Sequence, residues 1–261
     1  MQRFRFAVRY LGWIPAALVL AGCGTSSNLR DQRVLRVGVT PDYPPIVFKT
    51  NGVIRGVEAD LAAYAAQRLD ARLEFVELPF DDLIPRLNQG AIDVVMSGMT
   101  DTDYRRDDVR FVVPYMSMGQ MALVRAGDVA KYSESTNVYG TRLKVACISG
   151  TTSEMFVKEN TARAECISVS GPEAGIAELR EGTIDMYIDD APFVLQAAKD
   201  NPGLAPLQWL LTDEHLAWAV SKNKGYDELY EKLNHLVLHA KQNGDLRRII
   251  NRYFEIHVRV R

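Results

Sequence analysis

The sequence places residues that could bind charged groups at the ends of predicted strands. Arg105 follows the β-type run 92–97, and its planar guanidinium can hold a carboxylate through two parallel hydrogen bonds. Thr100 lies just before it and offers a hydroxyl and a backbone N–H to the same group. Asp190 follows a second such run, 184–188, and supplies a fixed negative charge. A fixed cation, oriented donors and a fixed anion suit a small dipolar molecule.

A predicted helix adds donors, although each of these residues also has an ordinary structural explanation. Thr151 and Thr152 open the predicted helix 153–160, where unpaired N–H groups and the helix dipole favour an anion by about 0.3–1 kcal/mol. The ordinary alternative is that both threonines serve only as helix caps. Arg105 lies in an acid-rich stretch typical of a solvated surface, and one acid of the pair 189–190 is expected to cap the next helix.

Other kinds of site have weaker support in the sequence. His235 and His239 are spaced i,i+4 with Glu231 one turn earlier, but no third ligand is suggested. A solvated helix face is expected there, and no metal site is predicted. Neither Cys147 nor Cys166 lies in a nucleophile-like sequence. No Walker-type loop or dinucleotide-binding glycine fingerprint appears, so no cofactor is predicted.

The composition is that of an ordinary globular protein. The 261 residues include 31 Lys+Arg and 33 Asp+Glu, with 47% hydrophobic and 25% charged residues. A net charge of -2 gives no polycationic surface, which argues against nucleic acid as a partner. At ~100–200 residues per domain, a chain of this length predicts two lobes or one large domain.

The N-terminus has the layout of a secretory signal. Residues 1–22 contain no acid, and their three arginines precede the apolar run 11–21. That run has about half of the ~20 residues that a membrane-spanning helix needs, so a transmembrane anchor is not expected.

The signal ends in a short motif, Leu-Ala-Gly-Cys at 20–23, which resembles the lipobox of bacterial lipoproteins. The resemblance implies that Cys23 becomes the acylated first residue of the mature chain, with palmitate among its acyl groups. Such a residue would anchor the protein to a membrane surface. Residues 23–31 would form a tether, because 24–29 are small and mostly polar. The folded body would then lie in the periplasm or on the cell exterior.

Two cysteines remain in this oxidising compartment. Cys147 and Cys166 each lie in a predicted strand, 143–148 and 165–169. Neither geometry nor register is visible from the sequence, so a disulfide and two buried thiols are both open, with the thiols slightly favoured.

Strands and helices alternate along the mature chain. The first series comprises a strand at 34–39, a helix at 58–69, a strand at 73–78, a helix at 81–88 and a strand at 92–97. The second series comprises strands at 143–148, 165–169 and 184–188 and helices at 153–160, 173–180 and 191–199. A further strand is expected at 216–221, then a helical segment at 226–253 that is broken near Gly244 and covers the first sheet. The alternation predicts an α/β fold with parallel sheets and helices on their faces.

Several short motifs follow one another in a characteristic order. They are 35–39, Tyr43-Pro44-Pro45, Gly56-Val57-Glu58-Ala59-Asp60-Leu61, 92–100, Arg105-Arg106, Pro114-Tyr115, 149–152 and 184–190. With these motifs in this order, the chain resembles the extracellular solute-binding proteins of family 3, which serve polar amino-acid ABC transporters.

The resemblance implies two Rossmann-like lobes with a ligand cleft between them, the type II periplasmic binding protein architecture. Lobe 1 would comprise residues 32–114 and 216–261, and lobe 2 would comprise 120–211. The segments 115–119 and 212–215 would form the hinge. Ligands also tend to bind at domain interfaces and at the carboxyl ends of parallel strands.

The resemblance also implies a role for each site residue. Arg105 would hold the α-carboxylate of an amino acid, Asp190 would hold its ammonium group, and Tyr43 and Phe80 would enclose its stem. The loaded protein would pass this ligand to an ABC permease. The expected ligand-binding residues are Tyr43, Phe80, Thr100, Arg105, Thr151, Thr152 and Asp190.

Two positions bear on the charge of the ligand. Ile148 stands where some family members have a basic or polar contact, which disfavours an acidic ligand. Asp189 could face the cleft and favour a second positive charge, or it could be solvated.

An enzyme on the same fold is the main alternative. The chain also resembles cyclohexadienyl or arogenate dehydratases at 96–98, 150–156 and 243–246. Those enzymes have a Glu and an Asn where this sequence has Phe193 and Ser153. Because a phenyl ring cannot donate a proton, a binding protein is predicted in preference to an enzyme. A ligand sensor for a signalling partner is a third alternative that no feature of the sequence discriminates.

Overall fold

The structure is a computed structural model that describes residues 33–134, 136–139, 142–161 and 163–254. The predicted signal, Cys23 and the tether lie outside the described residues. Within the described part of the chain, no helix is both long and apolar enough to cross a membrane.

The first sheet has five strands in the order β5-β1-β6-β15-β7. Strands β5, β1 and β6 are parallel, whereas β15 runs antiparallel to both β6 and β7. Its strands are β1 (Val34–Val39), β5 (Arg72–Glu77), β6 (Val94–Val95), β7 (Val109–Phe111) and β15 (Ala219–Ser221). The helices of this lobe are α1 (Val57–Arg68), the 3-10 helix η1 (Phe80–Asp82), α2 (Leu83–Asn88), α3 (Asp103–Arg106), α8 (Asp227–Gln242) and α9 (Asp245–Ile250).

Helices cover both faces of the first sheet. Val94 packs in a cluster with α1, α8 and α9, whereas the next residue, Val95, packs with Leu83 and Leu87 of α2. Successive strand residues point to opposite faces, so two adjacent valines serve two separate cores. In α1, the buried residues Leu61 and Ala65 recur at helical spacing on the side that meets the sheet.

The second sheet also has five strands, in the order β11-β10-β12-β9-β13. Strands β11, β10 and β12 are parallel, and β9 and β13 complete the sheet as antiparallel neighbours. Its strands are β9 (Gln120–Arg125), β10 (Lys144–Ile148), β11 (Glu165–Val169), β12 (Met186–Asp190) and β13 (Leu204–Pro206). The helices of this lobe are the 3-10 helix η2 (Ala126–Tyr132), α4 (Thr136–Tyr139), α5 (Thr152–Asn160), α6 (Pro172–Glu181) and α7 (Ala191–Asp200).

The second sheet is sandwiched in the same way. Tyr187 packs with residues of α6 and α7, whereas Ile188 packs with Phe156 and Val157 of α5 on the other face. The apolar cores therefore lie mainly within each lobe.

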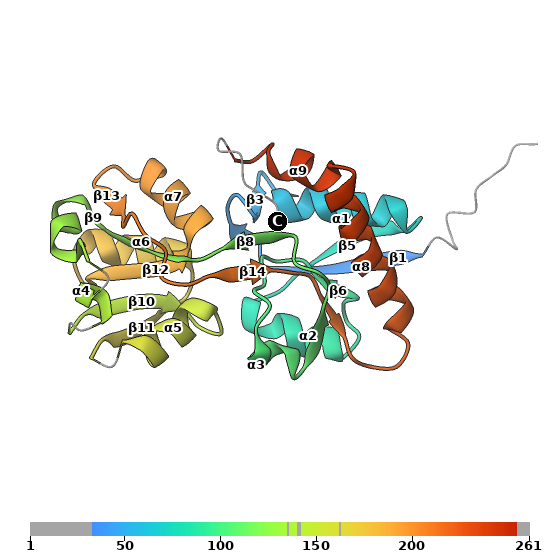
Figure 1. Cartoon of the computed structure of the whole chain (residues 1–261), viewed down its shortest axis with the longest axis horizontal. Coiled ribbons are helices and arrows are strands. Elements are labelled where there is room, and N and C mark those ends of the chain that lie inside the picture. Colours follow the sequence, from blue (N-terminus) through green and yellow to red (C-terminus); the bar gives the residue numbers. More distant parts are fainter. Residues whose placement is uncertain (1–32, 135, 140–141, 162, 255–261) are drawn as a thin grey trace, which may run out of the picture. The chain divides into compact units, whose positions relative to one another are not determined.

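Two antiparallel strands connect the sheets. β8 (Met116–Met118) pairs with β14 (Glu214–Leu216), and Figure 1 shows them running side by side between the two lobes. A small sheet of β2 (Asp42–Tyr43), β3 (Val47–Thr50) and β4 (Val53–Arg55) belongs to the first lobe. The two-lobed α/β architecture expected from the sequence is confirmed.

Four details differ from expectation. The strand expected at 92–97 is only the two-residue strand β6. Both sheets are mixed, because β15 and β9 enter them directly from the connecting strands and need no helical crossover. The strand expected at 216–221 is two strands, β14 and β15, which belong to different sheets. The strand expected at 184–188 is shifted to 186–190, so Asp190 is its last residue. The C-terminal helices α8 and α9 do pack on the first sheet.

We expect the packing of α8 to contribute to the free energy of unfolding. Leu233 is fully buried beneath this helix, whereas Leu238 on the same helix is 40% exposed. Leu233→Ala should lower the free energy of unfolding by about 2–5 kcal/mol, since it leaves a cavity. Leu238→Ala should change it by less than about 0.5 kcal/mol. Urea unfolding monitored by fluorescence measures both, and equal losses would contradict the placement of α8.

Candidate functional site

A small cavity of about 70 Å³ lies where the two lobes meet. Loops at the ends of β1, β6, β10 and β12 line it, so it is formed at the carboxyl ends of strands from both sheets. All seven residues expected to bind ligand line this one cavity. The lining residues are Thr40, Asp42, Tyr43, Phe80, Ser97, Gly98, Thr100, Arg105, Gln120, Ile148, Thr151, Thr152, Ser153, Pro172, Asp189 and Asp190.

Arg105 is the buried cation of the site, with 4% of its surface exposed. The short helix α3 fixes its backbone, because the Thr102 hydroxyl caps that helix by accepting from the Arg105 N–H. One guanidinium nitrogen donates to the Thr100 carbonyl at 2.9 Å, and the other donates across the lobes to the Gly150 carbonyl at 3.0 Å. Its charge also lies 5.3 Å from the centre of the Phe80 ring. Burial lowers the pKa of Arg105, and the nearby charges of Asp190 and Glu214 oppose this shift.

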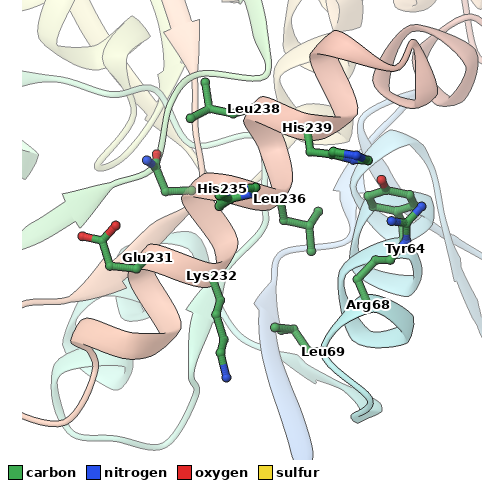
Figure 2. A pocket seen from close by; sticks show the side chains of 10 residues that line it. Tyr64, Arg68, Leu69, Glu231, Lys232, His235, Leu236, Leu238 and His239 are labelled. Carbon is green, nitrogen blue, oxygen red and sulfur yellow. The ribbon is translucent and has the colours of Figure 1, made fainter.

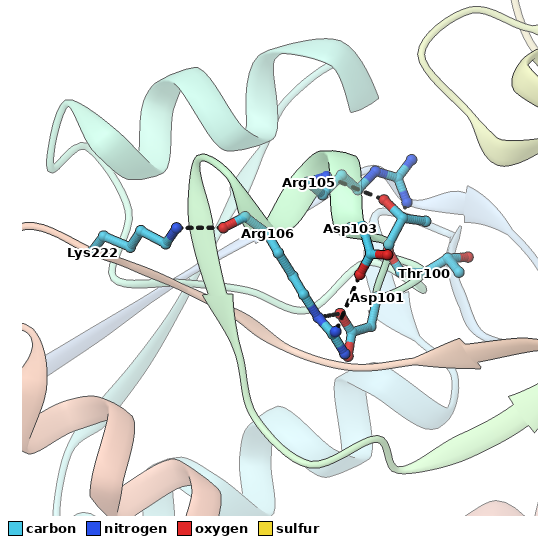
Figure 3. Close-up of polar contacts among 7 residues, drawn as sticks. Thr100, Asp101, Asp103, Arg105, Arg106 and Lys222 are labelled. Carbon is cyan, nitrogen blue, oxygen red and sulfur yellow. Dashed lines mark hydrogen bonds and ion pairs between the residues drawn. The ribbon is translucent and has the colours of Figure 1, made fainter.

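Two acids close to Arg105 in the sequence, Asp101 and Asp103, form ion pairs with Arg106 and not with Arg105. Figure 3 shows Arg106 bonded to Asp101 and Asp103, at 2.6 and 3.3 Å. Lys222 donates to the backbone carbonyl of Arg106 on the other side. The acid-rich stretch that suggested a solvated surface therefore serves the exposed Arg106, while Arg105 turns into the cavity.

Asp190 is the buried anion opposite. It occupies the cap position of α7 but makes no capping bond with its side chain. Its carboxylate accepts from the Tyr43 hydroxyl and from the Gln120 amide, both at 2.5 Å. Burial and the adjacent charge of Asp189 raise the pKa of Asp190 well above its ordinary value. A cation brought next to this carboxylate would lower that cost, so the site favours a positively charged group there.

A second buried acid, Glu214, joins threonines of both lobes. The hydroxyls of Thr100 and Thr152 both donate to Glu214, at 2.8 and 2.9 Å, and Thr212 donates at 2.7 Å. The Gln120 amide donates to the Thr152 hydroxyl at 3.0 Å. Glu214 lies in the connecting strand β14, so this network links that strand to the cavity.

Thr151 has a local role in the structure. Its hydroxyl donates to the Ile148 carbonyl at 2.6 Å and accepts from the Glu154 N–H as the cap of α5. It therefore holds the turn that presents Gly150 and Thr152 to the cavity.

Negative charge exceeds positive charge around the cavity. Among the charged side chains that line it, Asp42, Asp189 and Asp190 face a single cation, Arg105. Burial raises the pKa of Asp189 to about 6. The hydrogen bonds that its carboxylate accepts from the Tyr187 hydroxyl and the Asp190 N–H favour the charged form and oppose this rise. A ligand with more positive than negative charge would balance this set.

Tyr43 lines the cavity and packs against Phe193, with ring centres 6.3 Å apart. Phe193 also meets Tyr187 edge-on at 6.2 Å, so the position where the dehydratases have an acid is filled by an aromatic cluster. The Tyr43 ring lies close to Gly98, and only a residue without a side chain fits there. The φ of Gly98 is +65°, and a Cβ at this position would lie 2.7 Å from the Tyr43 ring.

Sequence reasoning missed Gln120 and Glu214, which hold several of the predicted residues in place. Both lie in or beside the strands that connect the lobes. No motif or periodicity marks them, since each becomes part of the site only when the chain crosses back between the sheets. Cys23 lies outside the described residues.

A larger hollow lies elsewhere, on the first lobe. It is a groove of about 730 Å³ between α1 and α8, shown in Figure 2. Tyr64 and Arg68 of α1 face His235 and His239 of α8 across it, and both histidines are exposed. In the part of the chain that the structure describes, no three His, Cys, Asp or Glu side chains gather as a metal site would need.

A buried carboxylate supports the cavity from below. Glu58, at the start of α1, is fully buried and accepts from the Gly98 N–H at 3.0 Å, the Tyr115 hydroxyl at 2.8 Å and the Trp218 indole at 2.9 Å. Tyr115 and Trp218 flank the connecting strands β8 and β14, whereas Gly98 lines the cavity. Burial raises the pKa of Glu58 to about 7, although all three donors favour its charged form.

The chain thus folds into two α/β lobes with a cavity where they meet. The model for bacterial extracellular solute-binding proteins, family 3, matches residues 35–256, and the chain belongs to that family. It is a solute-binding protein and not an enzyme.

Similar proteins include binders of basic amino acids. The putative ABC transporter arginine-binding protein 2 of Escherichia coli is 28% identical over 92% of this chain and 97% of its own length. The binding component of an ABC transporter from Wolinella succinogenes, solved with lysine, has 29% identity and a TM-score of 0.79 over 85% of this chain and 96% of its own. An ancestral amino acid-binding protein, a precursor of cyclohexadienyl dehydratase, has 33% identity and a TM-score of 0.78 over 85% and 95%.

We predict that Glu58 makes stability depend on pH. Because its pKa of about 7 in the fold exceeds the ordinary 4.5, the folded protein binds this proton more tightly than the unfolded chain does. The resulting stabilisation is present below about pH 4.5 and is lost as the pH rises to about 7. The loss amounts to about 3 kcal/mol. Glu58→Gln removes this dependence. Urea unfolding of the natural protein and the variant at pH 5 and pH 8 should therefore give a difference in the free energy of unfolding that changes with pH. A constant difference would contradict the assignment.

Proposed function

We propose that this protein captures an amino acid outside the cytoplasm and delivers it to an ABC permease. The observation that carries the proposal is that Arg105 and Asp190, from opposite lobes, line the same cavity. The guanidinium suits the α-carboxylate of an amino acid and the carboxylate suits its ammonium group. Tyr43 and Phe80 would enclose the stem between these two ends.

Ligand-driven closure follows from this arrangement. Polar contacts join the lobes at Arg105 to Gly150 and at Tyr43 to Asp190, and Thr152 of lobe 2 donates to Glu214 in the hinge segment. The cavity of about 70 Å³ is below the ~300–1,000 Å³ common for ligand sites, so the lobes must part for entry. A ligand that bonds to Arg105 and Asp190 at once would replace these contacts and favour the closed arrangement.

We further propose that the ligand carries a net positive charge, as arginine, lysine or histidine can. Once Arg105 pairs with the α-carboxylate and Asp190 with the ammonium group, Asp42 and Asp189 still face the cavity. A cationic side chain would balance them. The relatives named for arginine and the structure solved with lysine support this ligand class.

The lobe boundaries and the anchor belong to the same proposal. Lobe 1 comprises 32–114 and 216–261, lobe 2 comprises 120–211, and the hinge segments 115–119 and 212–215 contain most of β8 and β14. Export through the N-terminal signal and acylation of Cys23 would hold the protein at a bacterial membrane, next to its permease. Metabolic labelling with palmitate, compared between the natural chain and Cys23→Ser, tests the anchor.

We expect Arg105→Ala to abolish binding, with a loss of affinity of at least ~100-fold, because the ligand carboxylate would be buried without its partner. Arg106→Ala, one residue away on the exposed side, should leave affinity within about twofold. Isothermal titration with arginine, lysine and histidine measures both. The assignment fails if Arg105→Ala binds as tightly as the natural protein, or if both variants lose affinity equally.

The charge of the ligand side chain should decide selectivity. Arginine should bind at least ~10-fold more tightly than citrulline, its uncharged isostere, because burying an acid without a counter-charge is costly. Asp189→Asn should narrow this ratio, whereas Asp200→Asn, at the exposed end of α7, should preserve it. Competition titrations of the two ligands give the ratio directly, and equal affinity for both ligands in the natural protein would rule out a basic ligand.

A further inference from the structure

Two thiols of the second lobe lie side by side on neighbouring strands. Cys147 is in β10 and Cys166 in β11, and the parallel register pairs Cys147 with Ser168 and Cys166 with Val145. Residues paired in a ladder share a face of the sheet, and so do residues two apart along a strand. Both thiols therefore point to the same face, as diagonal neighbours, and their Sγ atoms are 2.8 Å apart.

A small movement separates this contact from a covalent bond. A disulfide has its sulfurs at about 2.05 Å, so the two atoms need to approach by only about 0.8 Å. Neighbouring strands lie about 4.8 Å apart and two residues along a strand span about 6.6 Å, so diagonal Cα atoms are roughly 8 Å apart, beyond the usual limit of about 6.8 Å for a disulfide. The start of one strand must therefore shift toward the other.

The start of β11 is held by hydrogen bonds to one neighbouring strand only. β11 is the edge strand of its sheet and pairs only with β10, so its movement disrupts no second ladder. Cys166 is the second residue of this strand. A displacement at this position bends the end of an edge strand and leaves the centre of the sheet unchanged.

The two thiols differ in how an external reagent reaches them. Cys147 is fully buried against Phe156 and Val157 of α5, whereas Cys166 is half-buried at the edge of the sheet. Burial raises the pKa of the Cys147 thiol. Cys166 is thus the thiol that meets an oxidant first, and Cys147 is placed to react with the product.

We propose that Cys147 and Cys166 form an intramolecular disulfide once the protein has been exported. The Cys166 thiolate attacks the disulfide of a thiol oxidant, either a protein disulfide or a small-molecule disulfide, and releases one of its thiols. The Cys147 sulfur then attacks this mixed disulfide and releases the second thiol. The two cysteines lose two protons and two electrons in total, and the oxidant's disulfide is reduced to two thiols.

The bond would close a ring that contains part of the lobe-2 lining of the cavity. The segment between the two cysteines contains the turn with Gly150 and Thr152 and the whole of α5. This turn accepts the hydrogen bond from Arg105 and donates to Glu214. A cross-link at the base of the ring restricts the unfolded chain and keeps the two ends of this segment together.

Peptide mapping tests the bond in the natural, secreted full chain. Trypsin cleaves after Lys144, Lys158, Arg163 and Arg180, so Cys147 lies in peptide 145–158 and Cys166 in peptide 164–180, each with a single cysteine. Free thiols are alkylated with iodoacetamide under denaturing conditions before digestion without reductant. We expect the two peptides as one species that is two hydrogens lighter than their sum and that separates on reduction. Recovery of both peptides separately and alkylated would overturn the proposal.

A second measurement tests what the bond does. Reduction with a phosphine should lower the melting temperature of the natural protein by roughly 5–10 °C, as expected for a ring of this size in a domain of this length. The double variant Cys147→Ser/Cys166→Ser should melt at the same temperature with and without the reductant. An unchanged melting temperature in the natural protein would refute the stabilising role of the cross-link.

Discussion

A buried guanidinium sets the conditions for the rest of the cleft. Arg105 is almost entirely removed from solvent, and its charge must be met by oxygen atoms that the fold provides. The carbonyls of Thr100 and Gly150 do so, one from each lobe. Because Arg106 pairs with the nearby acids Asp101 and Asp103, the charge of Arg105 is kept for the cleft.

The lobes meet mainly through polar groups. The apolar clusters pack inside each lobe, apart from Tyr43, whose ring reaches the cluster of the second lobe. Hydrogen bonds from Arg105 and Tyr43 cross the boundary instead, and Thr100 and Thr152 are linked across it through Glu214. Such a boundary can open without exposing a hydrophobic core, which suits a protein that must accept and release a small solute.

Glu58 and Glu214 show how the connecting strands reach the cleft. Glu58 joins the Gly98 turn to Tyr115 and Trp218, while Glu214 of β14 accepts from threonines of both lobes. Motion of the two connecting strands is therefore coupled to the positions of the cleft residues through buried hydrogen bonds. Buried bonds of this kind are costly to leave unsatisfied, which favours a small number of defined arrangements.

Local patterns predicted the elements better than they predicted the sheets. The strands 34–39 and 165–169 begin and end where the apolar runs do, and the helix break near Gly244 separates α8 from α9. By contrast, the apolar run at 216–221 is divided between two sheets, and nothing in the run itself marks the division. The antiparallel strands β9 and β13 fall outside the regular alternation of strands and helices, so the order of elements does not indicate which strands they pair with.

The sequence alone determined the family, the two α/β lobes and the set of chemical groups at strand ends, because periodicity and motif order are properties of the chain. Only the tertiary structure decided that Arg106 pairs with Asp101 and Asp103, that Gln120 lines the cavity and that Glu214 bonds to two of its threonines. It also decided that the sulfurs of Cys147 and Cys166 meet. These outcomes depend on strand register and on the path of the chain between the sheets, and long-range packing fixes both.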